Sequence, residues 1–321
     1  MVLFKADRTP IEGFHPMTIV VNLSGGIGNQ LFQLAFARSK SMQLGKQTIV
    51  THEFLKDGAG RNLLPWINDR NAFYSYYELK SKSRTRKLWS YSNEKRRLGL
   101  EFVDLNFGKQ SIFSLPHFFE NYRQFVYEFL IADRGYFEGT FASRLYWDRS
   151  EFDELRRWIL NLLVEYCPSE QSERPFGVSV HARRGDYVTN QKTRNFHGYC
   201  GNSYFVEALM RASDLGFTNK GVLISSDDKQ YASDLQQIAK RFTRRVDVVE
   251  TNNPYRTLIQ LTNSKAFIGS NSTFSFWAGY LNERDLRIFP SEWFMSKKQS
   301  FSPGNLFLDD PILLESALVT R

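Results

Sequence analysis

Short apolar runs alternate with helical patterns at the start of the chain. Residues 17–23 are rich in β-branched side chains and predict a buried strand. A glycine turn follows at 24–28, and the apolar positions within 29–43 then fall on one face of a helix. Residues 47–51 predict the next strand. Strand, glycine turn, helix and strand in this order are typical of a parallel α/β layer.

The second half of the chain shows the same alternation. Strands are predicted at 176–180, 221–225, 245–250, 266–268 and 288–289, and a helix over about 274–281. Because strands again alternate with helical spans, a second parallel sheet is expected. Polar or charged residues directly follow three of these strands, and open α/β sheets bind ligands at the carboxyl ends of their strands.

Length and composition agree with two α/β domains. The chain has 321 residues, of which 42% are hydrophobic and 24% charged, so disordered and fibrous classes are excluded. The polar run 168–175 is the best candidate for a boundary. We therefore predict an N-terminal domain at 1–167 and a C-terminal domain at 168–321.

The charge balance favours an anionic ligand, since 42 Lys and Arg residues against 34 Asp and Glu give a net charge of +8. A nucleotide, a phosphorylated substrate, a lipid headgroup or a nucleic acid would each suit it. Basic residues cluster at 80–97 together with two aromatic residues. This cluster is either a solvated face of a helix or a binding patch.

The compartment is predicted from cysteines and hydropathy. Cys167 and Cys200 match no zinc spacing and are too few for a disulfide framework, so free thiols are expected. No stretch approaches the roughly 18 apolar residues needed to cross a bilayer. Charged residues interrupt positions 1–16, which therefore do not form a signal peptide. These features predict a cytoplasmic protein.

The glycine turn offers its backbone to a ligand. Gly26 and Gly28 allow a close approach, and the helix that follows presents N–H groups to an anion. The turn is not a dinucleotide fingerprint, because Leu31 occupies the place of the third glycine. It is not a P-loop, because no Gly-Lys-Ser/Thr follows. A tight structural turn and a ligand contact both stay open.

The segment 181–186, His-Ala-Arg-Arg-Gly-Asp, carries more chemical information. Arg183 and Arg184 follow a strand directly and place permanently charged groups at the ligand edge. A guanidinium binds two phosphate oxygens at once, which an ammonium does not. Asp186 either forms a surface ion pair or holds an arginine in place.

Two further polar segments follow strands. Asp227 and Asp228 follow one strand, and one of them can accept hydrogen bonds from a base or sugar while the other caps a helix. Alternatively, both acids have only turn or capping roles. Segment 270–273, Ser-Asn-Ser-Thr, opens a helix, either as an ordinary N-cap or as donors around a phosphate. No two aspartates are spaced two apart and the histidines form no ligand cluster in the sequence, so chemistry without a metal is expected.

Together, three segments resemble the α-1,2-fucosyltransferases of bacteria and animals, glycosyltransferase family 11. They are 25–33 (GGIGNQLFQ), 181–187 (HARRGDY) and 270–277 (SNSTFSFW), in matching order and approximate spacing. Weaker similarities occur at 135–137, 204–205, 226–228 and 290–294. Residues 138–147 depart from the family pattern, which puts the choice of acceptor in doubt rather than the donor. In addition, the first 16 residues have no counterpart in the family, and Ala182 replaces a more usual Val.

The resemblance implies a GT-B-like α/β fold, with two Rossmann-type domains and a donor cleft between them. It implies inverting, metal-independent transfer of L-fucose from GDP-β-L-fucose to the 2-hydroxyl of a β-galactoside-type acceptor in a surface glycan. The partners are then the GDP-sugar donor and an oligosaccharide acceptor, with no cofactor and no nucleic acid. Another GDP-deoxyhexose donor or acceptor, or a non-catalytic nucleotide-binding module, is the alternative.

The resemblance also implies roles for single residues. Arg183 would grip the pyrophosphate, and Asp186 is the accompanying catalytic candidate. Donor contacts are expected from Gly26, Gly28, Asn29, His181, Arg184, Asp227, Asp228, Asn271, Ser272, Thr273 and Phe274. Residues 80–97 are the candidate contact with the inner face of a membrane.

Overall fold

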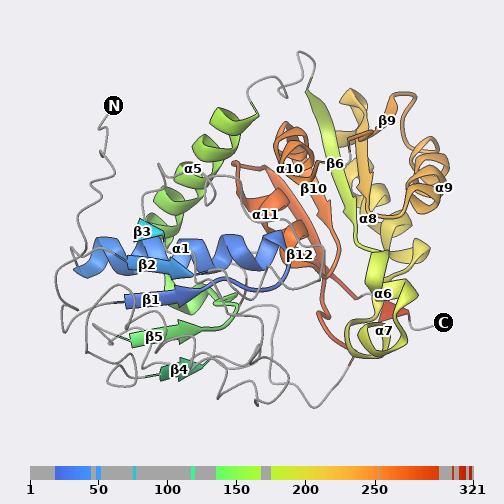
Figure 1. The fold of residues 1–321 in the computed structure, drawn as a ribbon. Helices are drawn as coiled ribbons and strands as arrows, with labels where there is room; N and C mark the ends of the chain where they lie inside the picture. Colours follow the sequence, from blue (N-terminus) through green and yellow to red (C-terminus); the bar gives the residue numbers. More distant parts are fainter. Residues whose placement is uncertain are drawn as a thin grey trace, which may run out of the picture. The chain divides into compact units, whose positions relative to one another are not determined.

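Two parallel sheets organise the part of the chain that the computed structural model describes. That part consists of residues 19–44, 48–51, 75–76, 117–119, 135–167, 175–251, 253–295, 306, 311–315 and 318–319. The chain divides into two compact units, 1–142 and 143–321, each with its own sheet (Figure 1).

The sheet of the first unit has the order β3-β2-β1-β5-β4, and all its pairs are parallel. Its elements are β1 (Ile19–Asn22), α1 (Ile27–Leu44), β2 (Thr48–Thr51), β3 (Ser75–Tyr76), β4 (His117–Phe119) and β5 (Gly135–Glu138). Helix α1 packs on β1 and β2. Its Phe36 stacks on Phe141, and both rings are buried in the core of this unit.

The sheet of the second unit has the order β12-β11-β10-β6-β8-β9, again parallel throughout. Its strands are β6 (Phe176–Ala182), β8 (Val222–Ser226), β9 (Val246–Val248), β10 (Ser264–Gly269), β11 (Leu286–Pro290) and β12 (Ile312–Leu314). A separate antiparallel pair joins β7 (Tyr199–Cys200) to β13 (Leu318–Val319).

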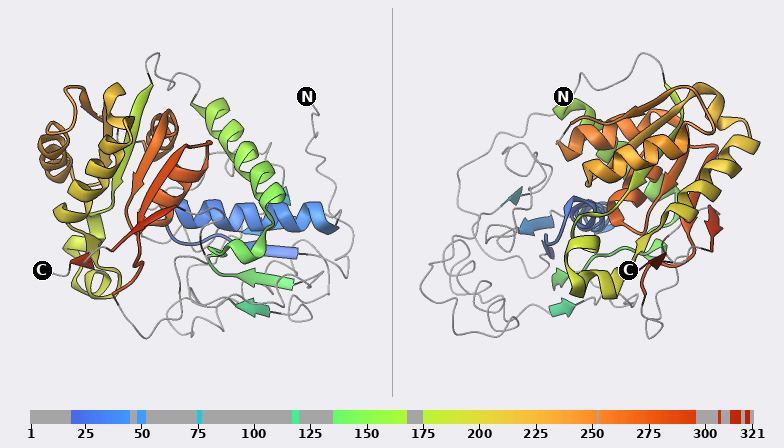
Figure 2. Two further views of the ribbon diagram at one scale, coloured as in Figure 1. Left: turned by 180° about the vertical axis from the view of Figure 1, so that it is seen from behind. Right: turned by 90° about the vertical axis from the view of Figure 1, so that its right-hand side faces the viewer.

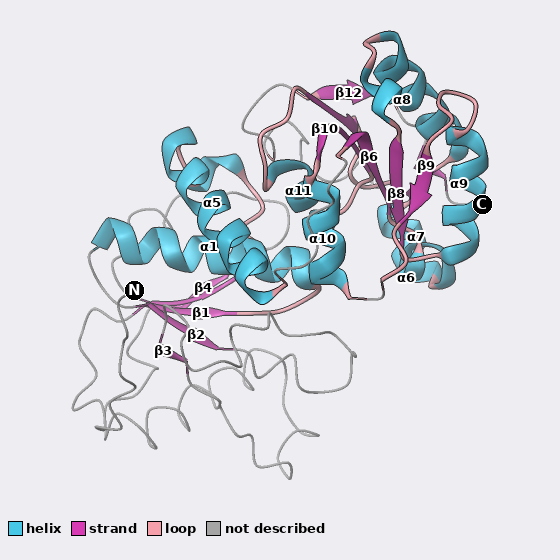
Figure 3. Ribbon diagram, turned by 90° about the horizontal axis from the view of Figure 1, so that it is seen from above, coloured by secondary structure: helices cyan, strands magenta, loops and turns pink. Residues whose placement is uncertain are grey.

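Helices cover both faces of this second sheet. On one face lie α8 (Asn202–Asp214) and α9 (Lys229–Ala239), and on the other lie α10 (Pro254–Thr262) and α11 (Thr273–Tyr280), as Figures 2 and 3 show. All seven residues of β6 are buried. Val178 and Val180 join the core under α8 and α9, whereas His181 bonds to α11. Strand alternation therefore turns His181 away from the larger core.

The second unit begins at residue 143 and not at the predicted 168, so that it includes helix α5 (Arg149–Tyr166). The ring of Phe152 packs against Trp277 of α11, with centroids 5.8 Å apart. Arg156, also on α5, forms an ion pair with Glu283 at 3.1 Å. Since these contacts tie α5 to the second sheet, the second unit begins at residue 143 and not at 168.

The predicted fold class is confirmed, because each unit is a Rossmann-type parallel sheet with packed helices. No helix among the described residues has the length and apolar character that a membrane span requires. Cys167 and Cys200 are buried thiols and form no disulfide. Residues 80–97, the predicted membrane contact, lie outside the described residues.

Candidate functional site

The order of strands in the second unit creates a switch point beside β6. The chain passes from β6 to β8 and β9 on one side, and then returns to place β10 on the other side. Pairing of His181 with Gly269 and with Ser225 brings the carboxyl ends of β10, β6 and β8 level. Ligands of open α/β sheets bind at such a point. The three polar segments predicted from the sequence therefore meet there.

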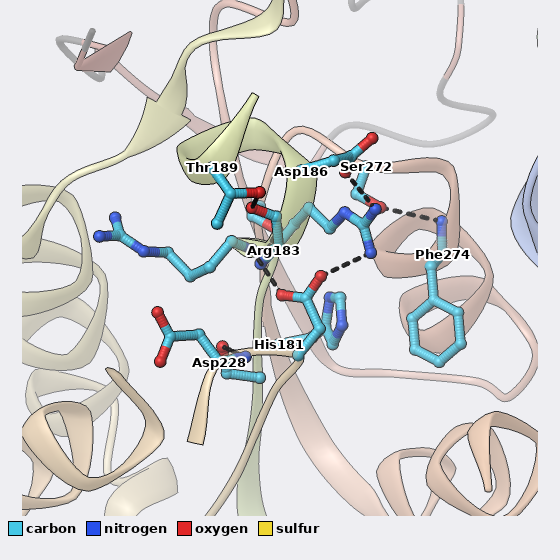
Figure 4. Close-up of polar contacts among 12 residues, drawn as sticks. His181, Arg183, Asp186, Thr189, Asp228, Ser272 and Phe274 are labelled. Atoms are coloured by element: carbon cyan, nitrogen blue, oxygen red, sulfur yellow. Dashed lines mark hydrogen bonds and ion pairs between the residues drawn. The ribbon is translucent and has the colours of Figure 1, made fainter. Parts of the chain in front are cut away.

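Arg183 lies at the centre of this meeting point (Figure 4). Its Nη1 lies 2.6 Å from Oδ2 of Asp227, and its Nη2 donates to Oδ1 of Asp186. Its backbone N–H donates to Oγ of Ser270 at 2.9 Å. Burial lowers the pKa of the guanidinium, but Asp227 and Asp186 raise that pKa by more, so the net shift is upward. Arg183 is thus a fixed cation that joins all three segments.

Asp227 ties the end of β8 to the segment after β6. While Oδ2 faces Arg183, Oδ1 accepts a hydrogen bond from the backbone N–H of Arg184 at 2.6 Å. The next residue, Gly185, has φ +27°, and a Cβ there would collide with the Asp227 carboxylate. Glycine is therefore required at 185 for this approach.

Arg184 directs its side chain to two aromatic rings rather than to these carboxylates. Its Cζ lies 4.1 Å from the ring centroid of Tyr199 and 4.0 Å from that of Tyr231. Its Nε is buried and has no hydrogen-bond partner among the described residues. The two adjacent arginines thus have different surroundings, which the sequence did not distinguish. A donor contact of Arg184 stays a prediction.

Asp228 caps a helix. Its Oδ1 accepts from the N–H of Tyr231 in the first turn of α9 at 3.0 Å. Its own N–H donates to Oγ of Ser226 at 3.1 Å. Because Asp227 pairs with Arg183 instead, the two neighbouring acids have separate tasks, and the prediction that one of them caps a helix is confirmed.

A buried polar network joins β6 to the start of α11. Nδ1 of His181 lies 2.6 Å from Oγ of Ser275, which lies 3.0 Å from Oγ of Ser270. Burial, with a smaller contribution from Arg183, lowers the pKa of His181 to about 3. The imidazole is therefore neutral at physiological pH. The ring of Phe274 lies against it, with centroids 4.7 Å apart.

The segment before α11 caps this helix and also donates hydrogen bonds to two remote stretches of backbone. Ser272 is the N-cap, and its Oγ accepts from the N–H of Phe274 at 3.2 Å, which confirms the capping interpretation. The fully buried side chain of Asn271 donates to the carbonyls of His197, at 2.9 Å, and Trp293, at 3.2 Å. Thr273 is the first residue of α11. Contacts of these residues with a phosphate stay predictions.

His197 is a neighbour of the site that no motif in the sequence indicates. It is the last residue of α7 (Gln191–His197) and stacks on Tyr187, with ring centroids 4.4 Å apart. Tyr187 in turn lies 5.4 Å from Cζ of Arg183. Burial lowers the pKa of His197 to about 4, and Asp186 opposes this shift. Only the tertiary structure brings this neutral imidazole beside Arg183.

The glycine turn of the first unit is held by two glutamines. Oε1 of the buried Gln33 accepts from the N–H of Ser24 at 2.8 Å, and its Nε2 donates to the carbonyl of Gly139 at 2.7 Å. Nε2 of Gln30 donates to the carbonyl of Gly25 at 3.0 Å. These two side chains explain why the motif needs glutamine at both places, which sequence reasoning did not address.

The donor candidates of this turn have different exposure. Gly26 is exposed, and a Cβ there would have nothing within 4 Å. Gly28 is buried, and the N–H of Asn29 donates to the carbonyl of Gly26 at 3.0 Å. Across the described parts of both units, no three His, Cys, Asp or Glu side chains are grouped to hold a metal ion.

Two Escherichia coli proteins are similar to this chain over most of its length. An alpha-1,2-colitosyltransferase is 26% identical over 310 residues, which cover 89% of this chain and 96% of that protein. The O-antigen biosynthesis glycosyltransferase WbnK is 27% identical over 301 residues, 87% of this chain and 95% of that protein.

Among solved structures, the structure of POFUT1 in complex with GDP-fucose is similar over 85% of this chain and 97% of the POFUT1 chain. The identity is 13% and the TM-score is 0.45. This likeness is too loose to carry an argument about activity. The model of glycosyl transferase family 11, by contrast, matches residues 18–305, which include the motifs of both units. The chain therefore belongs to glycosyl transferase family 11.

Proposed function

We propose that this glycosyltransferase moves L-fucose from GDP-β-L-fucose to the 2-hydroxyl of a β-galactoside-type acceptor in a bacterial surface glycan. The observation that carries the proposal is the position of Arg183, a fixed guanidinium at the switch point of a family 11 fold. A guanidinium at this place suits the diphosphate of a nucleotide sugar.

The proposed reaction is a displacement with inversion. The acceptor oxygen forms a bond to the anomeric carbon on the face opposite the diphosphate, while the bond from that carbon to the phosphate oxygen breaks. The GDP leaves with the electron pair, and the hydroxyl proton passes to a base. Negative charge therefore grows on the leaving group, where Arg183 neutralises it without a metal ion. Loss of such a contact typically costs about 10²–10³ in rate.

The other contacts follow the resemblance. We assign guanine or ribose contacts to His181 and Asp228, and place the glycine turn and Asn29 on the donor as well. Asp186 is the candidate catalytic carboxylate, although in this structure it pairs with Arg183. We propose the cytoplasm as the location, with 80–97 as the membrane contact. Liposome co-sedimentation that is insensitive to neutralising those basic residues would contradict the membrane contact.

The name of one relative supports a second donor. The alpha-1,2-colitosyltransferase of E. coli has the linkage proposed here but a different sugar, at 26% identity. Colitose has the skeleton of L-fucose without the 3-hydroxyl, so one site could accept either sugar. Absence of a hydroxyl changes specificity strongly only where the site hydrogen-bonds to it. GDP-colitose is therefore the competing donor.

The proposal is tested by GDP release in the presence of EDTA. The full chain is incubated with GDP-fucose and with GDP-colitose, each with lactose or N-acetyllactosamine. We expect turnover with GDP-fucose and an α-1,2 linkage in the product. Faster turnover with GDP-colitose than with GDP-fucose would make GDP-colitose the donor in place of GDP-fucose. No turnover with either donor on a broad acceptor panel would refute the transferase assignment proposed here.

A further inference from the structure

Two carboxylates share the guanidinium that the proposed function assigns to the donor. Asp227 lies on Nη1 of Arg183 and Asp186 lies on Nη2. One positive charge thus faces two negative charges. A diphosphate adds further negative charge within a few ångströms, where like charges repel strongly. Binding beside both carboxylates is unfavourable, so one of them has to move away.

Nearby histidines do not supply the missing positive charge. His181 and His197 both interact electrostatically with Arg183, but burial lowers their pKa values to about 3 and about 4. The guanidinium of Arg184 is stacked between Tyr199 and Tyr231. Since none of these three described groups offsets the repulsion, we infer that the carboxylates themselves relieve it.

Asp227 is the carboxylate that is fixed. Its Oδ2 forms an ion pair with Nη1 of Arg183, and its Oδ1 accepts a hydrogen bond from the backbone N–H of Arg184. Its side chain is 28% exposed, and Gly185 lies closely against it. Moving Asp227 would break an ion pair and a charge-assisted hydrogen bond, and would release the backbone that carries Arg183.

Asp186 is the carboxylate that can leave. Among the described residues it makes one side-chain ion pair, with Arg183, and its side chain is 44% exposed. It lies on α6 (Gly185–Thr189), a helix of five residues. Once displaced, its carboxylate is hydrated by water with little change in the backbone.

We propose that the donor binds by exchange of carboxylates on Arg183. The diphosphate takes the place of Asp186 on Nη2, while Asp227 stays on Nη1 and acts as the positioning residue for the guanidinium. This inference rests on the proposed function only for the diphosphate, and not for the base or the sugar of the donor.

The test compares two isosteric variants by calorimetric titration with GDP in EDTA. Asp227→Asn should weaken GDP binding about tenfold or more, because Arg183 loses the partner that orients it. Asp186→Asn should bind GDP as tightly as the wild type or up to about tenfold more tightly, because a neutral amide competes less with the diphosphate. Asp227→Asn should also raise the KM for the donor more than it lowers kcat.

A matched control removes a carboxylate at the amino end of a strand, whereas the site lies at the carboxyl ends. Asp285 precedes β11, is 60% exposed and faces Lys265 at 4.0 Å. Asp285→Asn should leave GDP affinity unchanged, and thermal melting of all three variants checks that they fold. If Asp186→Asn weakens binding as much as Asp227→Asn does, or if Asp227→Asn has no effect, the exchange is refuted.

Titrations with UDP, ADP and inorganic pyrophosphate separate this inference from the proposed function. If GDP does not bind but another diphosphate does, the proposed donor is wrong, and the exchange is judged with the ligand that binds. If no diphosphate binds to the wild-type protein, the exchange on Arg183 is refuted as well.

Discussion

Arg183 acts through geometry as well as charge. Its two Nη atoms contact different carboxylates, and its backbone N–H holds Ser270. A lysine would supply a single point charge, which cannot face two partners in one plane. The sequence alone indicated a cation at this position. The pairing with Asp227 came only from the structure, because that residue follows a different strand.

Arg183→Lys should reduce kcat by about 10²–10³ while the protein stays folded. The reason is that an ammonium cannot hold Asp227 and the leaving diphosphate together. The rate of GDP release measures the effect. Arg211→Lys is the matched control, because Arg211 is 49% exposed and pairs only with Glu207 at 3.1 Å among the ion pairs described. Turnover of Arg183→Lys close to wild type would remove Arg183 from the mechanism.

His181 should make stability depend on pH. Its pKa is about 3 in the folded state, against about 6.5 in an unfolded chain, so the unfolded state binds more protons between these values. The free energy of unfolding therefore has its full value above pH 6.5 and falls as the pH is lowered. One such residue contributes about 2 kcal/mol between pH 6.5 and 5.

The measurement is urea unfolding at several pH values for the wild type and for His181→Gln. The variant should show a smaller loss of stability between pH 6.5 and 5, since glutamine does not titrate. Carboxylates change the pH dependence of stability mainly below pH 5, and they affect both proteins alike. Parallel curves for the two proteins would contradict a neutral, buried His181.

Whole elements are held in place by single side chains of the motifs. Asn271 lies between a strand and a helix in sequence, yet its amide binds the carbonyls at the end of α7 and after β11. Gln33 likewise joins the start of α1 to the residue after β5. Single polar side chains of the motifs therefore hold loops in place within each unit, in addition to any ligand contact.

Asn271→Ala should destabilise the protein by about 3 kcal/mol, because buried carbonyls of His197 and Trp293 lose their donor. The neighbouring Ser272→Ala should cost about 1 kcal/mol, which is typical for an N-cap. Urea unfolding of both variants at neutral pH measures the difference. Equal stabilities of the two variants would contradict the stabilising role assigned to the hydrogen bonds of Asn271.

Among the elements, those with strong local patterns were predicted well. The predicted strands at 176–180, 221–225, 245–250, 266–268 and 288–289 are confirmed as β6, β8, β9, β10 and β11. Helices α8, α9 and α10 were not predicted as elements, and neither were the short strands β3 and β4. Two- and three-residue strands are too short for a periodic pattern.

The division of the molecule follows packing rather than composition. Phe152 on α5 packs among Phe276, Trp277 and Tyr280. The polar run that follows α5 falls within the second unit and does not mark the boundary between units. Local composition cannot distinguish these two cases.

A fragment of residues 143–321 should therefore melt cooperatively, whereas 168–321 should not. Without α5 the shorter fragment exposes the rings of α11, and loss of one buried Phe alone costs about 3–5 kcal/mol. Calorimetric melting of both fragments is the measurement. A cooperative transition of 168–321 at the same temperature as 143–321 would show that α5 does not belong to the second unit.

The sequence by itself determined the α/β class, most strands beside the site and the polar segments that follow them. These features depend on residues close together in the chain, so their periodicity and turn chemistry are visible locally. Only the tertiary structure decided that Asp227 anchors Arg183, that Arg184 stacks between tyrosines and that His197 approaches the site. These contacts join segments remote in sequence, and the order of strands that brings them together is not encoded in any local pattern.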